Sequence, residues 1–190
     1  IHPPLTANTS VHEGMRCLYC QDAPCITACP TGIDIPTYIR KITTGNVKGA
    51  AKTIYSSNIF GGSCARVCPV EVLCEGACVY HHMEERPVTI ALLQRYATDF
   101  AMKKKIQFFA PGKPTGKNVA VIGAGPSGLA CAHELRVLGH AVTVFEAKNI
   151  LGGLNTWGIA EYKMGKDVSL YEVQMILDLG VEVRENTPVT

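Results

Sequence analysis

The placement of cysteine is the feature that most restricts how this chain can fold. Of its nine cysteines, eight lie between positions 17 and 78, and the ninth stands alone at position 131. Such a density is explained either by disulfides or by bound metal. The eight form two groups, Cys17-x2-Cys20-x4-Cys25-x3-Cys29-Pro30 and Cys64-x3-Cys68-Pro69-x4-Cys74-x3-Cys78.

Residues 1–108 have the apolar spacing of helices and contain no strand-like alternation. The spacing predicts helices over residues 35–46, 47–58 and 86–105. Pro87 suits the first turn of the third helix, and the basic run 103–105 suits its carboxyl end. Two prolines and two glycines then predict a linker over residues 109–117.

A different pattern begins at residue 118 and continues to residue 190. The expected elements are strand 118–123, helix 126–139, strand 141–146, helix 166–180 and strand 181–185. Strands that alternate with helices predict a parallel sheet. The expected fold class is therefore an α-helical domain followed by an incomplete α/β Rossmann-like domain.

The turn after the first expected strand, Gly123-Ala124-Gly125-Pro126-Ser127-Gly128, matches G-x-G-x-x-G. In dinucleotide-binding folds the first glycine allows the tight turn, the second lets the backbone approach a pyrophosphate, and the third allows close helix–strand packing. Glu146 closes the second strand, where a carboxylate can accept hydrogen bonds from ribose hydroxyls. The motif therefore predicts a bound dinucleotide, and the alternative is a structural turn.

The residues after the second strand indicate which dinucleotide binds. Gly152, Gly153 and Leu154 resemble the second glycine pair of flavoproteins that have two dinucleotide domains, the glutathione-reductase-like class. We therefore expect FAD at this turn. Cys131 has no cysteine near it in the sequence, and we interpret it as a small buried apolar side chain.

With an intracellular type of nucleotide-binding unit downstream, metal explains the clustered cysteines better than disulfides do. The first group is close to the ferredoxin run C-x2-C-x2-C-x3-C-P, in which the fourth cysteine ligates a second cluster. Two structural zinc sites would need the same number of ligands and are the alternative. The two Cys-Pro pairs and the flavin unit favour iron–sulfur clusters.

Composition argues against two other classes. The net charge is +2, and residues 103–105 are the only basic run, which is unlike a dedicated nucleic-acid binder. No stretch reaches the ~18 apolar residues that would span a bilayer. We therefore expect a cytoplasmic protein that binds neither nucleic acid nor membrane.

Three stretches, MRCLYCQDAPCITACPTGIDIPTYI, GGSCARVCPVEVLCEGACVY and RPVTIALLQRYATDF, resemble the N-terminal domain of dihydropyrimidine dehydrogenases. They also resemble the small subunit of the bacterial NAD-dependent form. The similarity continues through GAGPSGLACAHEL and FEAKNILGGLNTWGIAEYK, and so covers essentially the whole chain. The glutamate synthase small subunit shares the layout, but its second cysteine group is more closely spaced and it lacks glutamine at the position of Gln94.

The resemblance implies two 4Fe–4S clusters whose ligands interleave along the chain. One cluster is held by Cys17, Cys20, Cys25 and Cys78, and the other by Cys29, Cys68, Cys74 and Gln94. Cys64 is then a spare thiol. The cysteine count alone points instead to Cys64 as the eighth ligand, because an amide oxygen is an unusual, hard donor to iron.

The resemblance also implies where FAD lies. The expected contacts are Gly123 to Ser127, Glu146, Ala147, Lys148, Gly152, Gly153, Leu154, Lys163 and the backbone of Val189. The family has arginine where this chain has Lys163, and lysine keeps the positive charge but loses the bidentate fork. The family also has proline where this chain has Ala160, which loosens the backbone there.

The implied function is electron relay from NAD(P)H through FAD and the two clusters to a distant FMN, where uracil or thymine is reduced. We interpret the chain as the electron-input module of an NAD(P)H-dependent dihydropyrimidine dehydrogenase with an FMN-containing partner subunit or domain. The alternatives are the small subunit of glutamate synthase or a related flavin reductase, and a zinc-stabilised interaction domain. No catalytic side chain is assigned, and we expect these residues alone not to oxidise NADH at a useful rate.

Overall fold

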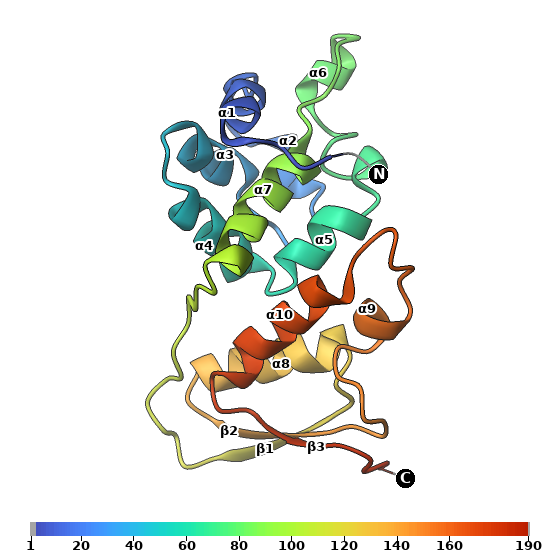
Figure 1. The fold of residues 1–190 in the computed structure, drawn as a ribbon. Coiled ribbons are helices and arrows are strands. Elements are labelled where there is room, and N and C mark those ends of the chain that lie inside the picture. The colour runs from blue at the N-terminus through green and yellow to red at the C-terminus, as the bar shows by residue number, and fades with distance from the viewer. Residues whose placement is uncertain (1–2, 190) are drawn as a thin grey trace. The chain divides into compact units, whose positions relative to one another are not determined.

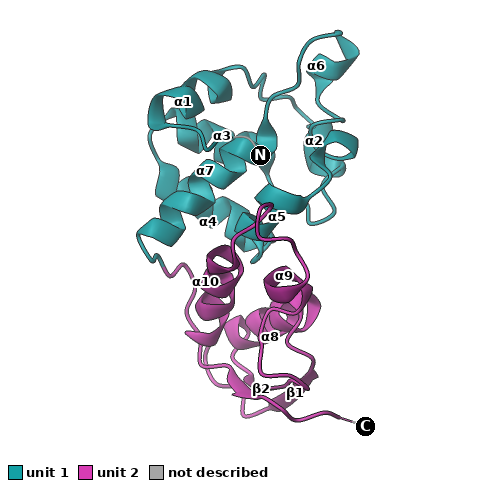
Figure 2. Cartoon of the chain, turned by 45° about the vertical axis from the view of Figure 1, so that its right-hand side comes forward, with its two compact units in different colours: residues 1–106 teal, residues 107–190 magenta. Residues whose placement is uncertain are grey.

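The chain divides between Ile106 and Gln107 into two units, which Figure 2 draws in different colours. The computed structural model describes residues 3–189. The first unit is built from helices and irregular loops, and the second has a small sheet with helices (Figure 1). The expected fold class, a helical domain followed by a Rossmann-like region, is confirmed.

The first unit has seven helices and one 3-10 turn in the described residues. They are α1 (Ala7–Met15), α2 (Pro24–Thr27), α3 (Ile35–Thr43), α4 (Val47–Ser57), α5 (Gly61–Val67), the turn η1 (Val70–Val72), α6 (Val79–His82) and α7 (Ile90–Lys103). The helices expected over 35–46 and 47–58 are confirmed as α3 and α4. Asp34 caps α3 by accepting the Thr37 N–H at 3.1 Å, and Asn46 caps α4 by accepting the Gly49 N–H at 2.9 Å.

The core of the first unit lies where α3, α4 and α7 pack together. α3 buries Ile35, Tyr38, Ile39 and Ile42, which recur at the spacing of one helix face. The Tyr38 hydroxyl donates to the carbonyl oxygen of Ile90 at 3.1 Å, so this buried polar atom has a partner. That bond fixes the start of α7 against α3.

α7 was expected to begin at residue 86, with Pro87 in its first turn, and that placement is wrong. The helix begins at Ile90, and Pro87 lies in the irregular segment before it. The Thr89 side chain makes no cap. Two carboxylates from other segments do so instead: Glu13 accepts the Thr89 N–H at 2.8 Å, and Glu75 accepts the Ala91 N–H at 2.9 Å.

The second unit has a three-stranded parallel sheet in the order β1-β2-β3. Its elements are β1 (Asn118–Ile122), α8 (Pro126–Val137), β2 (Ala141–Phe145), α9 (Leu154–Trp157), α10 (Lys166–Leu177) and β3 (Glu182–Arg184). The predicted strands and helices of this half are confirmed, whereas the short α9 was not predicted. Figure 1 shows α8 and α10 on one side of the sheet. Val121 on β1 and Val142 and Val144 on β2 are buried.

Cys131 was expected to be buried, and it is exposed on α8. The apolar side chains of α8 that face the sheet, such as Leu129, lie on the other side of the helix. In the described part of the chain, no helix combines the length and the apolar character needed to cross a bilayer.

Candidate cluster and nucleotide sites

One pocket of the first unit is lined by four cysteines from three separate segments. Cys17 follows α1, Cys20 lies in the loop after it, Cys25 is on α2, and Cys78 precedes α6. The loop between the first and third of these cysteines turns sharply, because Tyr19 and Asp22 both have a φ of +51°. The rest of the lining is mostly apolar. The fold therefore gathers the four residues that the sequence comparison assigned to the first cluster.

A second pocket of the same unit is lined by Cys29, Cys64, Cys68, Cys74 and Gln94. Cys29 follows α2, Cys64 is on α5 and Cys68 ends it, and Gln94 is on α7. Ile35 lines both pockets, so a single side chain belongs to both walls. All four residues expected for the second cluster lie here, together with the thiol that was expected to be spare.

The thiols that line the two pockets are donors of the kind that a 4Fe–4S cluster takes. Within residues 3–189 no three His, Cys, Asp or Glu side chains are grouped tightly enough to share one metal ion. A 4Fe–4S cluster has no such need, because each of its irons takes its own thiolate. Burial and the neighbouring thiolates raise the pKa of Cys25 to about 11, and burial with the charge of Glu75 raises that of Cys74 to about 12. A bound cationic centre would lower the pKa of these thiols and hold them as thiolates.

Gln94 is buried, with 5% of its surface exposed. Its amide nitrogen donates to the carbonyl oxygen of Gly61 at 2.8 Å, and its side chain lines the second pocket together with Cys64. Because the Gly61 carbonyl engages the nitrogen end of the amide, the carbonyl oxygen is the atom left to act as a ligand.

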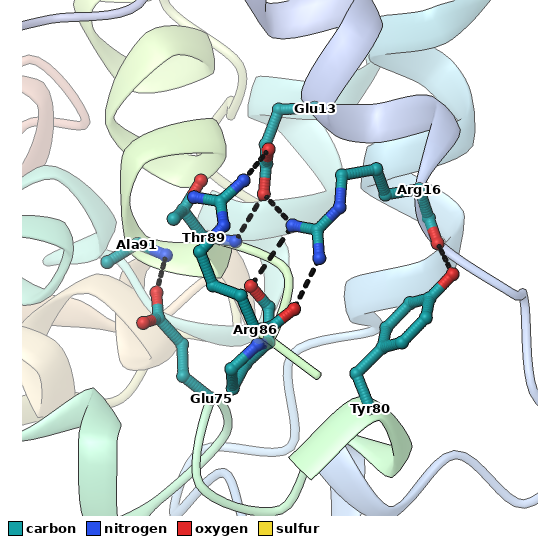
Figure 3. Close-up of polar contacts among 8 residues, drawn as sticks. Glu13, Arg16, Glu75, Tyr80, Arg86, Thr89 and Ala91 are labelled. Carbon is teal, nitrogen blue, oxygen red and sulfur yellow. Dashed lines mark hydrogen bonds and ion pairs between the residues drawn. The ribbon is translucent and has the colours of Figure 1, made fainter. Parts of the chain in front are cut away.

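Glu13, on α1, is the centre of a polar network shown in Figure 3. One carboxylate oxygen accepts the Thr89 N–H and an N–H of Arg16, each at 2.8 Å, and the other accepts from Arg86 at 2.9 Å. Arg16 also donates to the carbonyl oxygens of Pro87 and Arg86. Burial opposes ionisation of Glu13, but the Thr89 N–H and the two guanidinium groups outweigh it and lower the pKa.

The network joins the segments that carry the first set of cysteines. Arg16 immediately precedes Cys17, and its carbonyl oxygen accepts the Tyr80 hydroxyl at 2.9 Å. Tyr80 lines the first pocket two residues after Cys78, and the Arg16 guanidinium lies 5.3 Å from the centre of its ring. The end of α1 and the start of α6 are therefore held together by contacts that need no bound group.

The pKa of Glu75 is raised, whereas that of Glu13 is lowered. Glu75 follows Cys74, and burial raises its pKa despite the hydrogen bond from Ala91. Neither Glu13 nor Glu75 was picked out from the sequence. The sequence did contain one relevant signal, because the helix that follows Pro87 has no good capping residue at its start. The first N–H groups of such a helix need acceptors from other parts of the chain.

Replacing Glu13 by glutamine is expected to lower the free energy of unfolding by about 2 kcal/mol at neutral pH, because two charge-assisted hydrogen bonds weaken. The pKa of Glu13 is lowered in the folded state, so its contribution is present above the unfolded value, about 4.3, and is lost as the pH falls through the folded value. Urea titrations followed by circular dichroism at pH 7 and in acid measure both effects.

The control for that variant is Glu182→Gln, since the Glu182–Arg184 pair has both side chains more than half exposed. Exposed ion pairs contribute little to stability, so the free energy of unfolding of Glu182→Gln should match that of the wild type. An equal loss in both variants would show that the Glu13 network contributes no more than a surface charge.

The glycine-rich turn has the geometry that its motif requires. Gly123 has a φ of +92°, which favours glycine. A Cβ on Gly128 would stand 2.0 Å from the carbonyl oxygen of Gly123, so the third glycine is needed for close packing. A Cβ on Gly125 would meet nothing within 4 Å, which leaves open space at the backbone where a pyrophosphate would approach. α8 begins directly afterwards, at Pro126.

The second glycine pair and Glu146 lie against this turn. The Gly152 N–H donates to the carbonyl oxygen of Ala124 at 2.8 Å, and a Cβ on Gly153 would stand 2.8 Å from the Cα of Gly125. The Glu146 carboxylate accepts the N–H of Ala124 at 2.7 Å and that of Lys148 at 2.9 Å. Three features that are separate in the sequence thus form one site.

The remaining residues expected at this site are exposed. They are Ser127, Ala147, Lys148, Leu154, Lys163 and Val189. The Lys148 ammonium lies 4.0 Å from the centre of the Trp157 ring, and this pair joins the turn after β2 to α9. Trp157 was not selected from the sequence.

A helical unit with two cysteine-lined pockets, followed by a glycine-turn α/β unit, defines an iron–sulfur and dinucleotide-binding redox protein. Residues 1–106 match the family described as dihydropyrimidine dehydrogenase domain II, 4Fe–4S cluster, and the chain belongs to that family. Residues 121–163 match the NAD(P)-binding Rossmann-like domain. The family resemblance expected from the sequence is confirmed, as is the presence of an iron–sulfur and a dinucleotide-binding region.

Two curated relatives cover almost the whole chain. The NAD-dependent dihydropyrimidine dehydrogenase subunit PreT homolog of Salmonella typhi is 41% identical over 187 residues, which are 98% of this chain and 45% of that protein. The NAD-dependent dihydropyrimidine dehydrogenase subunit PreT of Escherichia coli strain K12 is 39% identical over 187 residues, again 98% of this chain and 45% of that protein. The chain therefore spans less than half the length of these relatives.

Proposed function

We propose that the chain is the electron-input module of an NAD(P)H-dependent dihydropyrimidine dehydrogenase, with one FAD and two 4Fe–4S clusters, serving an FMN-containing catalytic partner. The observation that carries the proposal is the sorting of eight cysteines and Gln94 into two pockets of the first unit, in a chain whose second unit has a dinucleotide-type glycine turn. The similarity to the PreT subunits of NAD-dependent dihydropyrimidine dehydrogenase supports the same activity.

The first cluster is assigned to Cys17, Cys20, Cys25 and Cys78, and the second to Cys29, Cys68, Cys74 and Gln94. When bound, the clusters supply one-electron carriers and FAD supplies the two-electron carrier that accepts from NAD(P)H. Ile35 lines both pockets, so clusters bound in the two pockets would be neighbours. The linings are mostly apolar, but seven of the eight cysteines in them are partly exposed. Solvent exposure is one of the factors that set the potential of a bound cluster.

FAD is assigned to the glycine turn of the second unit. Gly125 leaves the backbone open toward the pyrophosphate, and the start of α8 supplies its dipole. Glu146 lies at the end of β2, where a carboxylate binds a ribose hydroxyl in such folds. Gly152 and Gly153 lie against the glycine turn, and the Gly152 N–H donates to the carbonyl oxygen of Ala124. The G-x-G-x-x-G turn serves NAD and FAD alike, and the second glycine pair favours FAD.

The test is a cofactor analysis followed by an assay. Anaerobically purified protein should carry about eight iron and eight sulfide per chain, with one FAD released on denaturation. With an FMN-containing partner, the natural full-length protein should reduce uracil with NAD(P)H, and no reduction should occur without the partner. A colourless protein that contains zinc and no flavin would reject the proposal.

A further inference from the structure

A tight turn begins at Cys29, one of the cysteines of the second pocket. The Gly32 N–H donates to the carbonyl oxygen of Cys29 at 2.9 Å, which closes a turn of four residues over Cys29, Pro30, Thr31 and Gly32. Proline suits the second position because its φ is fixed, and Gly32 has a φ of +62°, which favours glycine. The sequence Cys-Pro-Thr-Gly therefore determines the conformation of the chain beside this thiol.

The turn brings the hydroxyl of Thr31 to the sulfur of Cys29. Thr31 Oγ1 and Cys29 Sγ form a hydrogen bond of 3.5 Å, and both residues line the second pocket. Between a thiol and a hydroxyl either group can be the donor, but a cysteine that ligates iron is a thiolate and has no proton to donate. With a cluster bound, the Thr31 hydroxyl is therefore the donor and the ligand sulfur is the acceptor.

We propose that Thr31 is a positioning residue of the second cluster, which acts through Cys29 by donating a hydrogen bond to the ligand sulfur and so raises the reduction potential of that cluster. The inference rests on the proposed function, because it presupposes a cluster that Cys29 ligates.

The direction of the effect follows from charge. Reduction adds one electron to the cluster and makes its sulfurs more negative, so a hydrogen bond to a ligand sulfur is stronger in the reduced state than in the oxidised state. Thr31 is exposed, so water competes for its hydroxyl, and the difference between the two states is smaller than the full value of a hydrogen bond to a charged group. The second Cys-Pro pair is followed by Val70, whose side chain cannot make the same contact with Cys68.

The experiment compares Thr31→Val, Thr31→Ser and Thr44→Val in the natural full-length protein, purified with its cofactors. Valine keeps the size and branching of threonine without the hydroxyl, and serine keeps the hydroxyl. Thr44, at the end of α3, is the matched control, because it is also exposed, its hydroxyl donates to the carbonyl oxygen of Arg40 at 2.9 Å, and it lines neither pocket.

Iron and sulfide are counted, and the potentials of the two clusters are measured by redox titration with electron paramagnetic resonance. The signal that Cys74→Ala loses identifies the second cluster, since Cys74 lines only the second pocket. All three threonine variants should keep about eight irons, because no assigned ligand is changed.

We expect Thr31→Val to lower the equilibrium constant for one-electron reduction of the second cluster by about three- to tenfold, which is a shift of about 30–60 mV to a more negative potential. Thr31→Ser and Thr44→Val should leave both potentials at the wild-type values. An unshifted second-cluster potential in Thr31→Val would overturn the inference, as would an equal shift in Thr44→Val. A wild-type protein without a second cluster would instead defeat the proposed function itself.

Discussion

Replacing Cys78 by alanine is expected to remove one cluster and leave the other intact. The variant should contain about four iron atoms in place of about eight, because the first pocket loses one of its four thiolates while the second loses none. Iron and sulfide analysis, with electron paramagnetic resonance of the reduced protein, measures the number and identity of the clusters that persist.

The matched variant is Cys74→Ala, which should lose the other cluster and keep the one that Cys78→Ala loses. Cys131→Ala, at the exposed thiol on α8, should retain both. If Cys78→Ala and Cys74→Ala abolish the same signal, the two cysteines share a cluster and the division into pockets does not describe the ligands.

Replacing Gly125 by alanine is expected to abolish flavin binding without unfolding the protein. The backbone of Gly125 has a φ of −77° and a ψ of 177°, which alanine adopts freely, and the added Cβ would meet no protein atom within 4 Å. It would instead occupy the space that a pyrophosphate needs. FAD affinity should fall by about two orders of magnitude or more, equivalent to about 2.7 kcal/mol, as measured by fluorescence titration of the apoprotein.

Gly128→Ala separates this effect from a folding defect. Its Cβ would stand 2.0 Å from the carbonyl oxygen of Gly123, so the variant should lose about 1–3 kcal/mol of stability as well as flavin. Measured on the apoproteins, so that bound FAD does not contribute, the thermal midpoint of Gly125→Ala should stay at the wild-type value while that of Gly128→Ala falls. Full flavin binding by Gly125→Ala would mean that the dinucleotide does not approach this turn.

The second unit was the easier half to predict, because its information is local. A strand, a glycine turn, a helix and an acidic strand end follow one another within about thirty residues, and the structure has each of them at its predicted place. The contact between Gly153 and Gly125 could be expected only by analogy. The exposure of Cys131 could not be predicted from its sequence neighbours, because it depends on which face of α8 meets the sheet.

The first unit shows the limit of sequence patterns more clearly. Helix periodicity located α3 and α4, but the start of α7 depended on Glu13 and Glu75, which lie far from it in the chain. An acceptor for a helix N–H is chosen by distance in space, and no local pattern contains that distance.

By itself the sequence determined that this chain has two cysteine groups suited to iron and a glycine turn suited to a dinucleotide. Spacing suggested that Cys29 serves a second cluster, but it could not divide the other cysteines, since neighbours in sequence need not be neighbours around a cluster. The tertiary structure decided that Cys25 and Cys29, only four positions apart, line different pockets, and that Cys78 joins Cys17. The physical reason is that side chains far apart in the sequence are brought together by tertiary packing, such as that of α5 against α7, which places Cys64 and Gln94 in one pocket.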